Sequence, residues 1–236
     1  MSESTMTSTD QGLHVGRLAT PAWQAAVEHL ARHAPADAPE ELLAQWRAAG
    51  IVDADLAVAP DWQRAIDAQT NAAAAITLVA RMSDVAFLTN LYLCPDLALD
   101  VAVTLRATVA EGSAVSRIDF VHPQAEVATA PHDRLWSLLR RVLPPLDAFR
   151  ADAPGTPAAA PVPVSSSGDA QTTAEKAEAS LFAFGAHAAS GRSEEAIWYL
   201  SGDTLHRLSP ATKEVLRVGH GDVASGLSAL AARLLG

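Results

Sequence analysis

The sequence predicts an α+β fold of two pseudo-twofold-related halves, each an antiparallel sheet packed with helices, with the second half smaller. Three observations predict it. Apolar residues recur at helical spacing before about residue 70, alternate with period two from about 75 to 121, and return to helical spacing from 131. A shorter run of the same element types follows after residue 171. Strands joined by short turns are typical of an antiparallel meander.

The first half is expected at residues 18–150, after a disordered tail at 1–17. Thr20 and Pro21 give a helix start, after which apolar residues share one face. A second helix is predicted from Asp37, with Glu40 completing a capping box, and Gly50 is its expected stop. A third short helix starts near Asp61. The helical region is therefore predicted to precede the sheet.

The predicted strands follow directly in the chain. A long strand with one buried face is indicated by apolar residues alternating from residue 97 to 109. Further strands are expected on both sides of it, and an amphipathic helix from Pro131 to the Pro144-Pro145 stop closes the half. These neighbouring strands are Ala75–Arg81, Val85–Leu93 and Val115–Val121, the last with a short extension toward Ala128.

A Pro-, Ala- and Ser-rich stretch at residues 151–170 predicts a linker, which places the second half at 171–236. This half is predicted to open with a helix from Thr172, because Ala177, Leu181, Phe184 and Ala188 form a helical stripe. Three short strands and a closing helix complete it. They are Ala196–Leu200, Thr204–Leu208, Lys213–Val218 and the helix Asp222–Leu235. The segment Arg106–Leu146 parallels Asp203–Gly236 in element order, which suggests the pseudo-twofold relation.

Charge and composition exclude several classes of function. Lys and Arg number 17 against 27 Asp and Glu, for a net charge of −10, and no basic run interrupts the acidic surplus. Nucleic-acid and anionic-membrane binding are therefore not expected. The polar first twelve residues lack a signal-peptide pattern, and no apolar run could span a bilayer, so we expect a cytoplasmic protein. The single cysteine, Cys94, is interpreted as a small buried hydrophobe.

No cofactor site, metal site or catalytic set emerges, and we expect a protein that is not an enzyme. His29 and His33 share a helix face, but HLARH lacks the glutamate of a metalloprotease motif and no third ligand is evident. Gly219–Ala224 matches G-x-G-x-x-A, yet too little chain follows for a dinucleotide fold. We interpret Asp222 there as a helix cap, and the acidic pairs Asp53/Asp55 and Asp96/Asp100 as solvated loop residues.

One predicted strand, Val85–Leu93, is apolar on both faces. Val85, Phe87, Leu91 and Leu93 share one face, whereas Ala86, Leu88 and Tyr92 share the other with Asn90. Two-sided apolarity means either helices on both sides or a partner on one side. If a partner binds there, Leu88 and Tyr92 are the residues expected to touch it.

The stretch LLAQWRAAGIVDADLAVAPDWQRAI (Leu42–Ile66) resembles the EspG-type proteins of actinobacterial type VII (ESX) secretion. That family carries a helix, a "GlvD" turn and a short helix leading into strands, and Gly50–Asp53 occupy that turn. LLRRVLP (Leu138–Pro144) and Ser201–Leu235 are similar to the two half-endings of the family. The resemblance implies a pseudo-twofold α+β fold and a cytosolic chaperone that masks a hydrophobic tip of a helical, PE–PPE-like substrate. The Pro/Ala-rich linker and the short second half depart from the family pattern.

Three functions follow as hypotheses. The first is the chaperone or adaptor that masks an apolar patch of a helical protein partner. The second is a small-molecule binder or enzyme that uses a cleft between the halves. The third is a structural homodimer built from strand edges or helix stripes.

Overall fold

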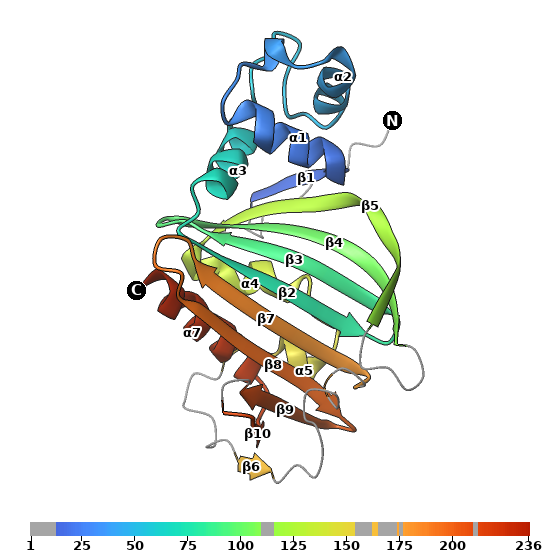
Figure 1. Cartoon of the computed structure of the whole chain (residues 1–236), viewed down its shortest axis with the longest axis vertical. Coiled ribbons are helices and arrows are strands. Elements are labelled where there is room, and N and C mark those ends of the chain that lie inside the picture. Colours follow the sequence, from blue (N-terminus) through green and yellow to red (C-terminus); the bar gives the residue numbers. More distant parts are fainter. Residues whose placement is uncertain (1–12, 110–115, 154–161, 165–173, 175–176, 210–211) are drawn as a thin grey trace.

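The computed structural model describes residues 13–109, 116–153, 162–164, 174, 177–209 and 212–236. Its centre is a single ten-stranded antiparallel sheet in the order β1-β5-β4-β3-β2-β7-β8-β9-β10-β6 (Figure 1). The predicted α+β class and the antiparallel pairing are therefore confirmed. The strands are β1 (Leu13–Ala19), β2 (Ala74–Met82), β3 (Val85–Leu93), β4 (Leu97–Val109), β5 (Ser116–Pro131), β6 (Val162–Val164), β7 (Ala179–His187), β8 (Ser193–Ser201), β9 (Thr204–Ser209) and β10 (Glu214–Arg217).

The helices lie in two groups. The first group precedes β2, at one end of the sheet, and the second lies behind the sheet in the view of Figure 1. The first group is α1 (Thr20–Leu30), α2 (Glu40–Ala48) and α3 (Pro60–Thr70), with a 3-10 turn at Pro35–Asp37. The second is α4 (Leu135–Arg140), α5 (Asp147–Arg150) and α7 (Asp222–Leu235), with a 3-10 turn at His132–Arg134.

The expectation of a separate sheet in each half is wrong, because one sheet runs through both. Strand β2 pairs antiparallel with β7 along its whole length, from Ala74 opposite His187 to Met82 opposite Ala179. Neither strand leaves a free edge at the junction. Pairing satisfies the backbone groups that two isolated sheets would have exposed. The β2–β7 pair joins the two halves, and the local sequence pattern does not specify such long-range pairing.

The predicted helix with the stripe Ala177, Leu181, Phe184 and Ala188 is also wrong, because this segment contains β7. Leu181 is fully buried whereas the side chain of Phe184 is 53% exposed. On a helix the two would share one face, but three residues apart on a strand they point to opposite sides. Pairing with β2 and β8 on both sides outweighs the local helical spacing.

Two segments expected to be unstructured contain strands. Leu13–Arg17, assigned to the tail, lie in β1 and pair with β5. Val162–Val164, assigned to the linker, form β6 and pair with β10. The remainder of the linker, apart from residues 151–153, lies outside the described residues, as do residues 1–12. Short edge strands of this kind cover the outer backbone groups of β5 and β10.

One face of the sheet is covered by α4, α5 and α7, and we call it the covered face. The central strands contribute fully buried residues such as Ile76, Leu78 and Leu181 to a continuous core with these helices. The helix α7 packs closely, since a Cβ at Gly226 would lie 2.5 Å from Cζ2 of Trp198. The predicted closing helix Asp222–Leu235 is confirmed, and its buried stripe faces β7 and β8.

The opposite face is covered at its β1–β5–β4 end by α1 and α3, and α2 packs on α1. Three tryptophans anchor this cover: Trp23, Trp46 and Trp62, all at most 4% exposed. The Nε1 of Trp46 donates to the Ala22 carbonyl at 3.1 Å, which ties α2 to α1. Neither α1 nor α2 has a side-chain cap, so the predicted capping box at Asp37 and Glu40 is wrong; Asp37 lies in a separate 3-10 turn.

Candidate partner-binding face

Beyond the cover of α1–α3, side chains of three central strands point away from the covered face. We call this region the open face. It alternates residue by residue with the buried core positions of the same strands, as the period of two requires. Its members are Leu88, Asn90 and Tyr92 from β3, Ala75, Thr77 and Val79 from β2, and Phe182, Phe184 and Ala186 from β7.

The register arranges the open face in rows that cross the strands. One row runs Leu88, Val79, Phe182 and Ile197, and is wholly apolar. It ends under cover, because Ile197 is buried in a small cluster against which Phe182 packs. The next runs Asn90, Thr77, Phe184 and Glu195. Within this second row the hydroxyl of Thr77 donates to Oδ1 of Asn90 at 2.9 Å. The face therefore combines apolar side chains with a few polar groups that are fixed by hydrogen bonds.

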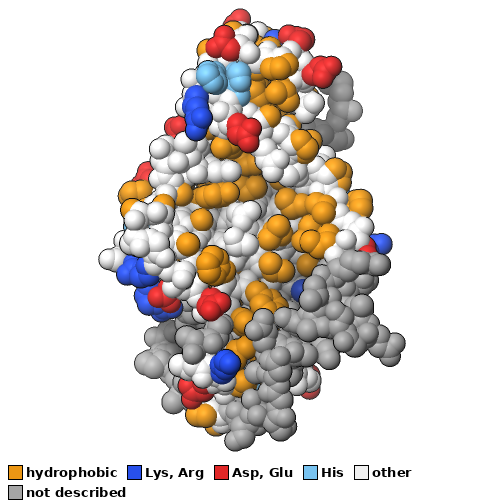
Figure 2. All heavy atoms as spheres, viewed as in Figure 1, with side chains coloured by type: hydrophobic (Ala, Val, Ile, Leu, Met, Phe, Trp, Pro, Cys, Tyr) orange, Lys and Arg blue, Asp and Glu red, His pale blue; other side chains and the backbone are white. Residues whose placement is uncertain are grey.

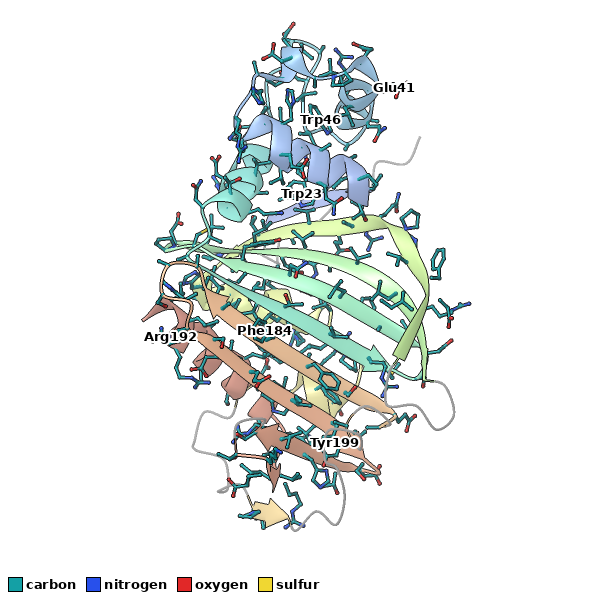
Figure 3. All side chains as sticks on the ribbon, viewed as in Figure 1. Trp23, Glu41, Trp46, Phe184, Arg192 and Tyr199 are labelled. Atoms are coloured by element: carbon teal, nitrogen blue, oxygen red, sulfur yellow. The ribbon has the colours of Figure 1, made fainter. Side chains whose placement is uncertain are left out.

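The open face is accessible in the described part of the molecule. Phe184, at the centre of the sheet, is 53% exposed, and every other member of the open face is half-buried. Figure 3 shows Phe184 projecting toward the viewer from β7, on the side opposite α7. Figure 2 shows hydrophobic side chains spread over this central region, with Lys and Arg gathered mainly at its margins. An exposed large apolar group in mid-sheet is the feature that a partner would cover.

The structure places both sequence-predicted residues on this face. Leu88 and Tyr92 are half-buried on β3, on the side away from Leu91 and Leu93. Tyr92 also packs against the core beneath α1–α3, and burial raises the pKa of its hydroxyl. Their contact with a partner stays a prediction. The alternative of helices on both sides holds at the α1–α3 end, where Leu99 and Val101 of β4 are buried.

Sequence reasoning missed Val79, Phe182 and Phe184. Two of the three lie on β7, which the helical stripe concealed. The signal was present as alternation: Ala179, Leu181, Ala183 and Gly185 face the core, and Phe182, Phe184 and Ala186 face the open side. Pairing with β2 determines that this segment is a strand and not a helix, and β2 and β7 lie about 100 residues apart in the chain.

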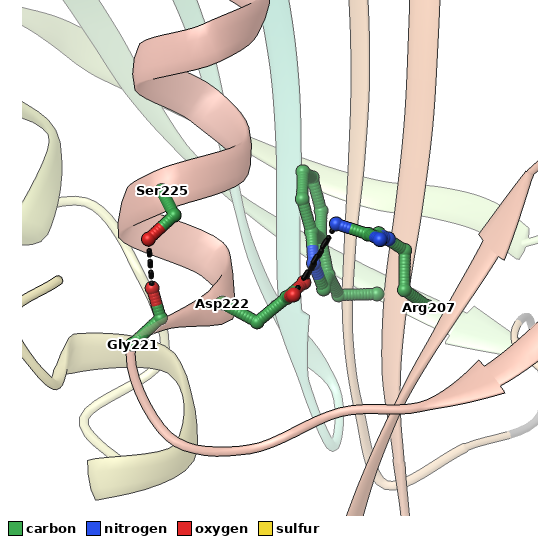
Figure 4. A network of polar contacts seen from close by, with 5 residues as sticks. Arg207, Gly221, Asp222 and Ser225 are labelled. Atoms are coloured by element: carbon green, nitrogen blue, oxygen red, sulfur yellow. Dashed lines mark hydrogen bonds and ion pairs between the residues drawn. The ribbon is translucent and has the colours of Figure 1, made fainter. Parts of the chain in front are cut away.

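The carboxylate at the start of the helix after the glycine turn, in Gly219–Ala224, is already bound by other side chains of the chain (Figure 4). Asp222 is the first residue of α7 and Gly221, with φ +84°, is the cap, so the prediction that Asp222 caps the helix is wrong. The Asp222 carboxylate accepts hydrogen bonds from Nε1 of Trp198 at 2.9 Å and from Arg207 at 3.2 Å. The Asp222 carboxylate would repel an anion at this helix start. Its hydrogen bonds to β8 and β9 instead orient α7 on the sheet.

Metal ligation finds no support among the described residues, which hold no cluster of three or more His, Cys, Asp or Glu. The His29 and His33 rings lie 5.2 Å apart, and Nε2 of His29 lies 3.1 Å from the Ala34 carbonyl. Asp53 is a turn residue, because its Oδ1 accepts the backbone N–H groups of Asp55 and Ala57 at 2.9 and 2.8 Å.

The interpretation of Asp100 as a solvated loop residue is wrong. Asp100 lies within β4 on the covered face, paired with Leu91 and Ala128, and is fully buried. Burial raises the pKa of its carboxyl to about 7, and the nearby charge of Arg141 opposes the shift in part. Cys94 is buried as expected, with Sγ 3.3 Å from the Ala68 carbonyl, and burial raises the pKa of its thiol.

The fold defines the class as an α+β protein with one antiparallel sheet. No protein-family model and no curated protein matches the chain. None of the helices within the described ranges is long and apolar enough to cross a membrane. The geometry of the open face therefore carries the functional argument.

Proposed function

We propose that this chain is a cytoplasmic binding protein of the chaperone or adaptor type, which masks an apolar surface of a helical protein partner on its open face. The observation that carries the proposal is Phe184, a large apolar side chain 53% exposed at the centre of the sheet. Leu88, Tyr92, Val79 and Phe182 extend the apolar surface around it. Burying such a surface stabilises a complex by about 25 cal/mol per Å² of apolar area before association costs.

A helical partner suits this surface because a helix presents an apolar stripe without unpaired backbone groups. The strands under the open face are paired on both sides, so none of them offers an edge to an added strand. The resemblance of Leu42–Ile66 to EspG-type proteins supports the same kind of partner, a helical type VII secretion substrate.

We further propose that the two halves are related by a pseudo-twofold axis between β2 and β7. Counted outward from that pair, the strands run β2, β3, β4, β5, β1 on one side and β7, β8, β9, β10, β6 on the other. In each half the first strand of the chain is the outermost. The open face then spans the junction of the halves, with contributions from both.

Copurification with the helical proteins encoded beside its gene tests the proposal. Wild type is expected to retain such a partner, and Phe184→Ser or Leu88→Ser to lose it, because each places a polar group in the apolar band. Val85→Ser is the matched control, since Val85 is 38% exposed but lies on the other side of the sheet. A wild-type chain that elutes as a monomer beside these proteins, with no complex, would contradict the proposal.

A further inference from the structure

The row of the open face that contains Phe184 ends in a carboxylate. Glu195 on β8 lies directly opposite Phe184 on β7, as a cross-strand pair. Such pairs have Cβ atoms about 4.5–5.5 Å apart and side chains on the same side of the sheet. Both side chains are exposed. An aromatic ring and a carboxylate therefore stand side by side on the surface proposed to hold the partner.

Glu195 makes no ion pair within the described ranges, and its neighbour Glu194 shows the contrast. Glu194 faces the other side of the sheet, where its Oε2 lies 3.1 Å from Nε of Arg233 on α7. Two described arginines lie on the same side of the sheet. Arg81 is buried and donates to the Ser83 carbonyl at 3.1 Å, and Arg217 is exposed on β10, two strands away from Glu195. A bound partner can supply a cation that complements Glu195.

We propose that Phe184 and Glu195 together bind a guanidinium group of the partner helix, so that the partner carries an arginine beside its apolar stripe. A planar guanidinium can stack on an aromatic ring and pair with a carboxylate at the same time. An ammonium group does so less well, since it is a compact, strongly hydrated charge. The pair selects helices by charge, whereas the apolar band around Leu88 and Val79 accepts any apolar stripe.

Electrostatics at longer range favour the same partner. The chain carries a net charge of −10, which attracts a helix with basic residues and repels an acidic one. The inference rests on the proposed function, because it assigns a specificity residue to the same open face.

Two synthetic peptides of about 20 residues test the inference on the full chain. They share one amphipathic helical sequence with a Leu/Ala stripe, and differ in a single residue beside the stripe, arginine in one and uncharged citrulline in the other. Binding is measured by fluorescence anisotropy at low and high salt. We expect wild type to bind the arginine peptide about fivefold more tightly, with the difference shrinking at high salt.

Three variants separate the contributions. Glu195→Gln is expected to remove the preference and retain the binding of the citrulline peptide. Glu194→Gln, changed on the opposite face, is expected to keep the preference. Phe184→Ser is expected to weaken the binding of both peptides. Thermal unfolding shows that each variant is folded.

The outcomes distinguish this inference from the function on which it rests. Equal binding of both peptides to wild type, or an unchanged preference in Glu195→Gln, overturns the arginine site and leaves the open face as a binding surface. If neither peptide binds wild type, the proposed binding of amphipathic helices on this face is contradicted, and the arginine site with it.

Discussion

The two faces of the central strands differ in what covers them, although successive residues of the same strands form both. On the covered face, Ile76, Leu78 and Leu181 are sealed beneath α7 and its neighbours. On the open face, Val79, Phe182 and Phe184 stand one position along and retain contact with solvent. Consecutive apolar residues along a strand give it two apolar faces, and what packs on each face decides whether it is buried.

This difference separates stability from function within single strands. Residues on the covered face of these central strands are removed from water on folding, and their burial stabilises the fold. Residues on the open face keep part of their surface in contact with water, and a bound partner would bury that part. Substitutions on the covered face are expected to change unfolding, whereas those on the open face change binding.

Leu78→Ala should give the largest effect. Leu78 is fully buried at the sheet centre, and its truncation leaves a cavity, so the free energy of unfolding should fall by about 4 kcal/mol. Val79→Ala, one residue on and on the open face, should cost under about 1 kcal/mol. Urea denaturation measures both. Equal losses would show that the open face is buried as deeply as the covered one.

Asp100→Asn tests a carboxylate that is buried on the covered face. Since the pKa of Asp100 is raised from 3.8 to about 7, the folded protein binds this proton more tightly than the unfolded chain. Wild type should therefore lose stability relative to the variant as the pH rises from about 4 to about 7, by roughly 4 kcal/mol, and no more above that. Denaturation at several pH values measures the difference, and parallel curves would refute the buried charge.

Gly185→Ala tests how closely α7 approaches the sheet. A Cβ at this position would lie 2.4 Å from Cδ1 of Leu234 and 3.0 Å from Cδ2 of Leu230. The two leucine side chains or the helix itself would have to shift, at an expected cost of about 2 kcal/mol in the free energy of unfolding. Ala186→Val, the next residue and on the open face, should leave thermal stability nearly unchanged. A neutral Gly185→Ala would mean that α7 packs loosely.

The coupling between Trp23 and Gln69 is the smallest expected effect and tests the helical cover at the end of the open face. Nε1 of Trp23 donates to Oε1 of Gln69 at 2.9 Å, which joins α1 to α3. Loss of this hydrogen bond should cost about 1 kcal/mol. A double-mutant cycle of Trp23→Phe with Gln69→Ala measures the coupling. Zero coupling would show that the bond does not hold the two helices together.

Local pattern was sufficient where one periodicity dominated. The strand Val85–Leu93 and the helix Asp222–Leu235 have the predicted bounds, because their apolar spacing agrees with their final packing. It failed at β7, where Ala177, Leu181 and Phe184 fit a helix and Leu181 and Ala183 fit a strand. The prediction for Asp100 was wrong for a related reason, since nothing next to it in the chain indicates that α4 packs against its strand.

Residues a few positions apart along the chain specify the α+β class, the long alternating strands and the position of Leu88 and Tyr92 on one side of β3. Long-range packing is needed to join β2 to β7 in one sheet and to bring Phe184 and Glu195 together on its open side. The physical reason is distance along the chain. Strand pairing and helix cover arise from contacts about 100 residues apart, where loop-closure entropy and competing partners, rather than local spacing, select the outcome.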